Sequence, residues 1–369
     1  MDPIVLWQHK WSADLFIPTY LFLGGLTAGV FIVAALADLL SLRFRRFELV
    51  SRLAAFIAVP ILALAGFFLT VHLGKPERGL GFPLFFTNYN SWMTRGGWIV
   101  GASAPFVVLY AGLWYFRLFP GLRRTLAVIG IPLLALFAMY TGLLLSGAWY
   151  VPLWSGKYLP TLFLTSGLTT GVAAVGLIFL LTWPFLGQAV EDPRRVLRWF
   201  GVVLFLLILV ELYEVRAFMT YLSGTAPDKA VVETTPTGKF QAAMGSQLAY
   251  EYVTGGDGYP WKLFKGAAAE AGETGTFSKT LAPWFWWGII GLGFTLPLLL
   301  TVLEFAPKLF PQRISDRIAA VKFTLVLIGG YLLRVVIVWG GDLKAPLPYP
   351  PSMWQVPGIG GPPIPGLGG

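Results

Sequence analysis

The amino-acid sequence predicts an all-α integral membrane protein with about eight transmembrane helices, and three observations support this. Of the 369 residues, 56% are hydrophobic and only 12% are charged. The mean hydropathy of +0.70 is well above that of soluble globular domains. Apolar runs of about 20 residues or more, each long enough to cross a hydrocarbon core, recur along almost the whole chain.

The apolar runs also place the helices, to within a few residues at each end. The first run is too long for a signal peptide and lacks a small-residue cleavage site, so we expect it to be retained. The expected spans are residues 13–40, 50–73, 97–118, 122–148, 158–187, 198–222, 281–304 and 318–340.

The distribution of basic residues predicts the topology. Lys and Arg concentrate in the short loops after the first, third, fifth and seventh spans, and such loops stay on the cytoplasmic side. Both termini should therefore face the outer, periplasmic side of a bacterial or archaeal cytoplasmic membrane. The net charge of +9 is spread over these loops and does not indicate a nucleic-acid partner. The basic residues of these loops and their flanks are Arg43, Arg45, Arg46, Arg52, Arg117, Arg123, Arg124, Arg194, Arg195, Arg198, Lys308, Arg313, Arg317 and the neighbouring Lys322.

A short internal sequence repeat suggests how the helices are grouped. The segment LFLGGLTAGV (21–30) recurs as LFLTSGLTTGV (162–172), four helices later. The two copies would run parallel, which predicts two four-helix bundles, residues 1–156 and 157–340, related by an axis along the membrane normal. Close helix packing through Gly, Thr and Ser explains the same residues without a repeat.

Two polar segments lie outside the predicted helices. Residues 223–280 form an outer insertion, either a docking element or lid or a surface insertion with no direct chemistry. Residues 341–369 are rich in Pro and Gly and should form an extended tail, which can wrap along a partner.

The composition excludes several redox cofactors. The chain has no cysteine, whereas iron–sulfur clusters and c-type haem both need cysteine. A bis-histidine b-type haem would need both histidines of the chain, His9 and His72, and His9 precedes the first helix. We therefore expect no haem and no metal centre in this chain.

Few ionisable residues lie within the predicted helices, so each is a functional candidate. Glu211 and Glu214 share one helix face, and Arg334 in the last helix lies at a depth similar to that of Glu214. The three residues suit either a structural ion pair between helices or a proton relay beside a redox ligand. Asp38 and Glu304, at the inner ends of their helices, are expected to be solvated and close to loops.

Three further polar side chains fall in the outer half of the predicted bundle: Tyr20, His72 and Tyr140. Phenol and imidazole groups can hydrogen-bond the carbonyls of a quinone and exchange protons with it. Tyrosine is also enriched at membrane interfaces because it is amphipathic, which explains Tyr20 by itself. Tyr140 lies a few turns into its helix, and this position favours a binding role.

Several stretches, taken together and in this order, resemble the NrfD-like family, the membrane subunits of polysulfide reductase and of related complex iron–sulfur molybdoenzymes. They cover most of the chain, and the set is more specific than any single piece. The stretches are YLFLGGLTAGV (20–30), LGKPERGLGFPLFFTNYNSWMTRGGW (73–98), YTGLLLSGAWYVPLW (140–154), LAPWFWWG (281–288) and GGYLLRVVIVWGG (329–341).

The resemblance implies an anchor that binds menaquinone or ubiquinone near the outer face. Its partners would be an outer iron–sulfur subunit with several clusters and a molybdopterin catalytic subunit. Tyr140 matches the quinone-contacting tyrosine of the family, whereas Tyr20 and Ile17 stand where the family can carry histidine and asparagine. The chain would then carry the quinone half-reaction and no terminal substrate site. A proton-translocating subunit of a quinol-oxidising complex, a secondary transporter and a ligand-free anchor are the alternatives.

Overall fold

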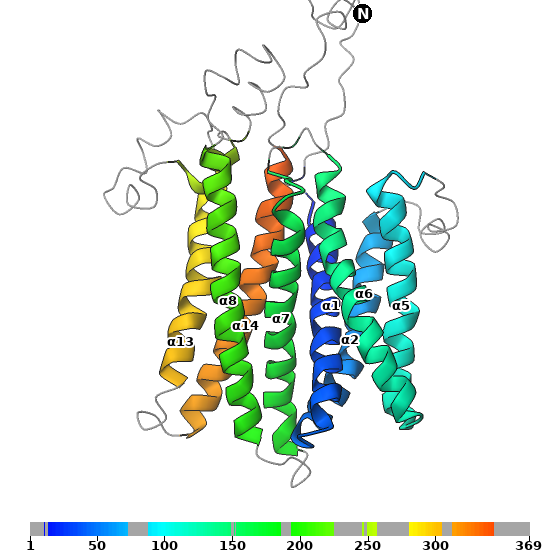
Figure 1. The fold of residues 1–369 in the computed structure, drawn as a ribbon. Coiled ribbons are helices and arrows are strands. Elements are labelled where there is room, and N and C mark those ends of the chain that lie inside the picture. The colour runs from blue at the N-terminus through cyan, green and yellow to red at the C-terminus, as the bar shows by residue number, and fades with distance from the viewer. Residues whose placement is uncertain are drawn as a thin grey trace, which may run out of the picture.

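The computed structural model describes residues 11, 14–72, 88–148, 151, 153–185, 193–224, 246, 249–256, 280–304 and 312–342. Among these residues, eight helices are long and apolar enough to span a membrane, which confirms the predicted class (Figure 1). They are α1 (Phe16–Ser41), α2 (Arg46–His72), α5 (Trp92–Phe116), α6 (Pro120–Ser146), α7 (Leu159–Thr182), α8 (Pro193–Gly224), the π-helical η4 (Trp284–Thr295) continued by α13 (Leu296–Glu304), and α14 (Gln312–Trp339).

Most helix boundaries fall near those expected, and the differences have local causes. Helix α5 begins at Trp92 instead of 97, because the Ser91 hydroxyl caps it by accepting the Met93 N–H at 3.2 Å. Helix α8 begins and ends outside its apolar run, since polar residues extend it at both ends. The wider π-helical winding of η4 has no counterpart in the hydrophobic pattern.

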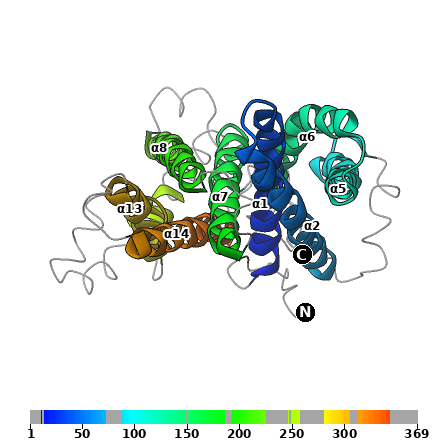
Figure 2. The same cartoon turned by 90° about the horizontal axis from the view of Figure 1, so that it is seen from below.

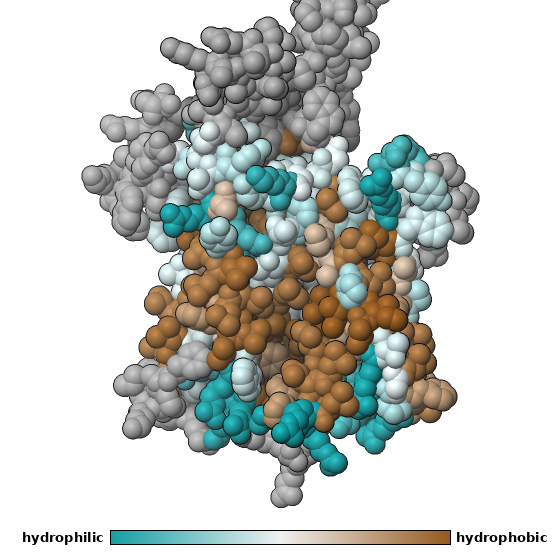
Figure 3. All heavy atoms as spheres, viewed as in Figure 1, coloured by the Kyte–Doolittle hydropathy of each residue, from teal (hydrophilic) through white to brown (hydrophobic). Residues whose placement is uncertain are grey.

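The two ends of the helix assembly are named here by their place in Figure 1. The upper end is where α1 begins and α2 ends, and the lower end is where the α1–α2 and α5–α6 turns lie. A hydrophobic band separates the polar surfaces at these two ends (Figure 3). This band is the surface expected of a protein that crosses a hydrocarbon layer.

Helices α1 and α7 form the centre of the molecule and are the most buried of the eight spans (Figure 2). They cross through glycines: a Cβ on Gly29 would overlap the Gly167 carbonyl, and a Cβ on Gly171 would overlap the Gly29 backbone. The two copies of the repeated segment, LFLGGLTAGV and LFLTSGLTTGV, are therefore packed against each other. Close packing accounts for their small residues.

Other helices pack on either side of this central pair. Helix α1 also contacts α2 and α6, and α5 packs against both of these. On the other side, α7 contacts α8 and α14, and α14 packs against η4 and α13. Adjacent glycines fit α14 into its place, because Gly329 faces the backbone of Gly293 while Gly330 faces Thr170 of α7.

Part of the predicted outer insertion packs onto the upper end. Residues 249–254 are helical, and Ala249 and Val253 are buried. The Trp286 indole N–H donates to the Thr254 carbonyl at 2.8 Å, which joins this segment to η4. Burial and the neighbouring Asp342 carboxylate raise the pKa of Tyr252. The rest of the insertion, His9 and the tail from 343 onward lie outside the described residues.

Candidate functional site

Two predicted tyrosines lie close together within about two turns of the upper end. Tyr20 of α1 is 2% exposed and Tyr140 of α6 is 4% exposed, and they are near enough to interact electrostatically. Neither hydroxyl has a hydrogen-bond partner among the described residues. A buried hydroxyl without a protein partner is uncommon, so this pair has unused capacity to bind a polar ligand.

A glycine that the sequence analysis missed makes room for one of these phenols. A Cβ on Gly96 of α5 would overlap both the ring and the hydroxyl oxygen of Tyr140. The side chain of Tyr140 therefore occupies space that any residue other than glycine would fill. The Gly-Gly pair at 96–97 inside a predicted helix was the available signal, because a helix-interior glycine is often kept for packing.

The third predicted residue, His72, lies at the upper end and has an acidic neighbour that the sequence analysis missed. The His72 Nδ1 is 3.1 Å from a carboxylate oxygen of Asp14, just before α1. The other Asp14 oxygen accepts the Phe16 N–H at 2.7 Å. The sequence could mark Asp14 as a helix-start residue, since an acidic residue just ahead of an apolar run is typical of one, but it could not show the contact with His72.

A second set of charged residues, separate from Asp14 and His72, lies near Arg334 of α14. The Arg334 side chain is 1% exposed. Its guanidinium lies 3.8 Å from the Phe163 ring centroid and donates from Nη2 to the Phe163 carbonyl at 3.0 Å. Its Nε and Nη1 have no hydrogen-bond partner among the described residues. Such donors in a folded protein are normally satisfied by ordered water or a ligand.

Glu211 of α8 faces this guanidinium, and Glu214 does not. Glu211 is 2% exposed, interacts electrostatically with Arg334 and lies beside Ser166 and Thr169 of α7. Within the described residues, no carboxylate lies within 4.0 Å of the guanidinium, so the interhelical ion pair is not a direct one. Glu214 is partly buried beside Thr165, with one oxygen unpartnered among the described residues.

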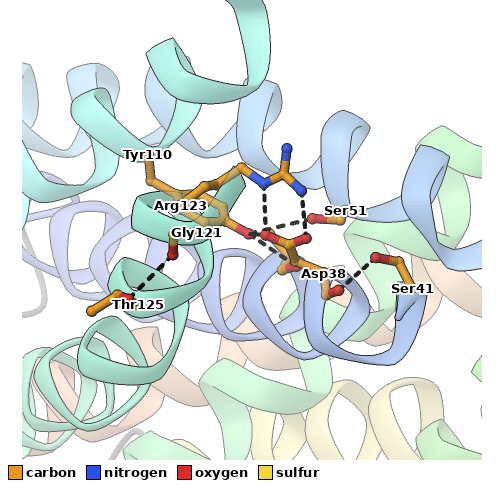
Figure 4. A network of polar contacts seen from close by, with 8 residues as sticks. Asp38, Ser41, Ser51, Tyr110, Gly121, Arg123 and Thr125 are labelled. Atoms are coloured by element: carbon orange, nitrogen blue, oxygen red, sulfur yellow. Dashed lines mark hydrogen bonds and ion pairs between the residues drawn. The ribbon is translucent and has the colours of Figure 1, made fainter. Parts of the chain in front are cut away.

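The expectation that Asp38 and Glu304 are solvated is wrong. Asp38 is fully buried and receives the Arg123 Nε and Nη2 at 2.8 Å each, with the Tyr110 hydroxyl at 3.2 Å (Figure 4). Near the lower end of α13 and α14, Glu304 forms an ion pair with the buried Lys322. Both carboxylates turn inward because a later helix presents a cation to each, Arg123 of α6 to Asp38 and Lys322 of α14 to Glu304.

The donor set suits a quinone better than a metal. Among the described residues, no group of three or more His, Cys, Asp or Glu side chains could hold a metal ion. By contrast, the phenols of Tyr20 and Tyr140 can donate to carbonyl oxygens or accept from hydroxyls. The described upper-end chemistry therefore fits a ligand that alternates between a dione and a diol.

The described residues define a multi-pass membrane protein with buried polar groups near the upper end of its helices. The family described as Polysulphide reductase, NrfD matches residues 8–345, so the chain belongs to this family. The chain is similar to the C subunit of polysulfide reductase from Wolinella succinogenes, with 26% identity over 347 residues, covering 88% of this chain and 93% of that protein.

Proposed function

We propose that the chain is the quinone-binding membrane subunit of a respiratory oxidoreductase. It would exchange electrons between the quinone pool and an outer iron–sulfur subunit, which in turn serves a molybdopterin catalytic subunit. One observation carries the proposal: two buried phenols, Tyr20 and Tyr140, meet at one end of an NrfD-family chain with their hydroxyls unpaired among the described residues. The similar Wolinella protein is named as part of a polysulfide reductase, which supports the kind of complex proposed.

In the proposed reaction, this chain binds the quinone head group and handles its protons. Oxidation of a quinol to a quinone releases two electrons and two protons. Tyr20 and Tyr140 would hold the ring oxygens through hydrogen bonds, and His72 would exchange a proton near the upper surface. The terminal substrate would be chosen by the catalytic subunit, because this protein contributes only the quinone half-reaction.

The proposed orientation places the upper end on the outer, periplasmic side of a cytoplasmic membrane, with both termini outside. Basic residues near the lower end, including Arg43, Arg45 and Arg117, support it through the positive-inside rule. We also propose two four-helix bundles, residues 1–156 and 157–340, with the 223–280 insertion and the 341–369 tail on the outer side. The site then lies next to the docking surface for the iron–sulfur subunit.

Replacing Tyr140 by phenylalanine in the complex purified with its partner subunits tests the quinone site. The variant loses one hydroxyl and keeps the ring beside Gly96, so folding should be preserved. We expect oxidation of a short-tailed quinol to slow about tenfold, the effect of one lost hydrogen bond. The matched control is Tyr115→Phe on the same group of helices, where the ring is 67% exposed. Equal quinol turnover in both variants would support a ligand-free anchor instead.

A second candidate function, proton relay through Glu211, Glu214 and Arg334, is favoured by the unpartnered atoms around them. Arg334 Nε and Nη1, Ser166 Oγ and one Glu214 oxygen all lack a partner among the described residues. These atoms come from α14, α7 and α8, and α7 packs against both of the other two helices, so bound water can bridge them. A hydrated path of this kind would lead protons toward or away from the upper end.

A further inference from the structure

The Asp14 carboxylate lies close enough to the His72 imidazole to influence its orientation. His72 is the last residue of α2 and retains 27% side-chain exposure, whereas the Asp14 side chain is only 8% exposed. The 3.1 Å separation joins a carboxylate oxygen to Nδ1 and not to Nε2. A carboxylate this close to Nδ1 favours the tautomer that carries its proton on Nδ1, in which Nε2 is the basic nitrogen of the ring.

Asp14 itself is held in place by contacts on three sides. One carboxylate oxygen accepts the Phe16 N–H at 2.7 Å and the Ile17 N–H at 3.4 Å at the start of α1. The backbone carbonyl accepts the Trp339 indole N–H at 3.2 Å, and the backbone N–H donates to the Trp11 carbonyl at 3.1 Å. The carboxylate is therefore fixed before His72 approaches it, which is the condition for orienting another side chain.

The contact lies at the same end of the helix assembly as the proposed quinone site. Asp14 precedes the helix that carries Tyr20, and the α2 helix that ends in His72 packs against both α1 and α5. Tyr20 and Tyr140 are buried below the upper end, whereas His72 is partly exposed. His72, as the last residue of α2, is closer to the upper end than either phenol.

We propose that Asp14 is a positioning residue that makes His72 the proton acceptor for quinol oxidation, an inference that rests on the proposed function. One quinol O–H bond breaks and its proton passes to His72 Nε2. The second hydroxyl proton leaves on the Tyr140 side or through water. The two electrons pass one at a time to an iron–sulfur cluster of the partner subunit, and quinone is the product. The imidazolium then releases its proton at the upper surface.

The test compares Asp14→Asn and His72→Gln in the complex purified with its partner subunits. Asparagine caps a helix about as well as aspartate, so α1 should keep its start while the charge beside His72 is lost. We expect the kcat for a short-tailed quinol to fall about 10- to 100-fold in each variant, with quinone affinity and melting temperature close to wild type. The double variant should be no slower than His72→Gln alone, because both residues act in one step.

The matched control is Asp342→Asn, whose carboxylate accepts the Trp11 backbone N–H at 2.6 Å at the same end of the molecule. We expect it to keep wild-type kcat. A normal kcat in Asp14→Asn beside a slow His72→Gln would overturn the proposal, as would a joint loss of melting temperature and quinone affinity in Asp14→Asn. If Tyr140→Phe slows turnover while His72→Gln does not, His72 is not the proton acceptor, but the proposed quinone site is still supported. If none of these variants slows turnover, the proposed function fails with it.

Discussion

At the scale of single residues, the main question is whether Arg334 and Glu211 form a structural pair or a proton relay. Burying a charge costs free energy, so either role must offset that cost. Arg334 is 1% exposed, and its nearest opposite charge, on Glu211, acts without direct contact. A purely structural pair would be expected to close up, since direct hydrogen bonds offset the cost of desolvation. The gap between the two charges favours a group that exchanges protons through water.

Glu211→Gln separates the structural and relay roles. Loss of the carboxylate leaves the Arg334 guanidinium buried without a nearby negative charge, at a cost on the order of 1–3 kcal/mol. The double variant Glu211→Gln with Arg334→Gln removes both charges and should recover most of the melting temperature. If the pair relays protons, quinol turnover should stay reduced by about 100-fold in the double variant. Recovery of turnover together with stability would identify a structural pair.

At the scale of helices, the α1–α7 crossing holds the molecule together. Four of the described helices contact α1 directly, and the contact with α7 depends on backbones that approach without side chains between them. Small residues allow such an approach, and helices in lipid gain van der Waals contact from it in place of a hydrophobic driving force.

We expect Gly29→Ala to destabilise the protein by about 1–3 kcal/mol, because its Cβ would overlap the backbone carbonyl of Gly167, which is less able to move aside than a flexible side chain. The matched control is Gly66→Ala in α2, where no atom lies within 4 Å of the added Cβ. Alanine favours helix over glycine, so the control should be neutral or slightly stabilised. Melting temperatures in detergent measure both, and equal values would show that α1 and α7 do not cross at Gly29.

At the scale of the whole molecule, the proposed function depends on which way the upper end faces. The proposed quinone site and the Asp14–His72 contact both lie at that end. An iron–sulfur partner on the outer side can accept electrons only if the upper end is also outside.

The absence of cysteine from the sequence makes the orientation directly measurable. Single cysteines at Tyr89, 60% exposed at the upper end, and at Leu42, 62% exposed at the lower end, would report the two sides. We expect a membrane-impermeant maleimide to label Tyr89→Cys in intact cells without an outer membrane, and Leu42→Cys only after permeabilisation. The reverse labelling pattern would place the quinone site on the cytoplasmic side and contradict the proposed electron path.

The sequence predicted the class of fold well, because a transmembrane helix is a local property of about 20 consecutive apolar residues. The number of spans and most of their limits follow from such runs. The environment of a polar residue is not local in this sense. Asp38 looked solvated because Arg123 and Tyr110, which bury and satisfy it, come from two later helices.

The same limit applies to the candidate site. Tyr20, Tyr140 and His72 could be selected as polar groups in one half of the bundle, but their neighbours could not. Asp14 and Gly96 matter through contacts with residues far along the chain, and a single sequence does not pair such residues. The π-helical winding of η4 was equally hidden, because hydrophobic periodicity does not distinguish it within a uniformly apolar segment.

The glycine crossing has a consequence for how the protein is made. Gly29 belongs to the first span and its partners Gly167 and Gly171 to the fifth, so this contact is non-local in the sense of contact order. Synthesis delivers the spans from the N-terminus onward. Until the fifth span is inserted, the glycine face of the first span must therefore contact lipid or another protein segment in the bilayer. The centre of the molecule is assembled late, although it begins with the first helix to be made.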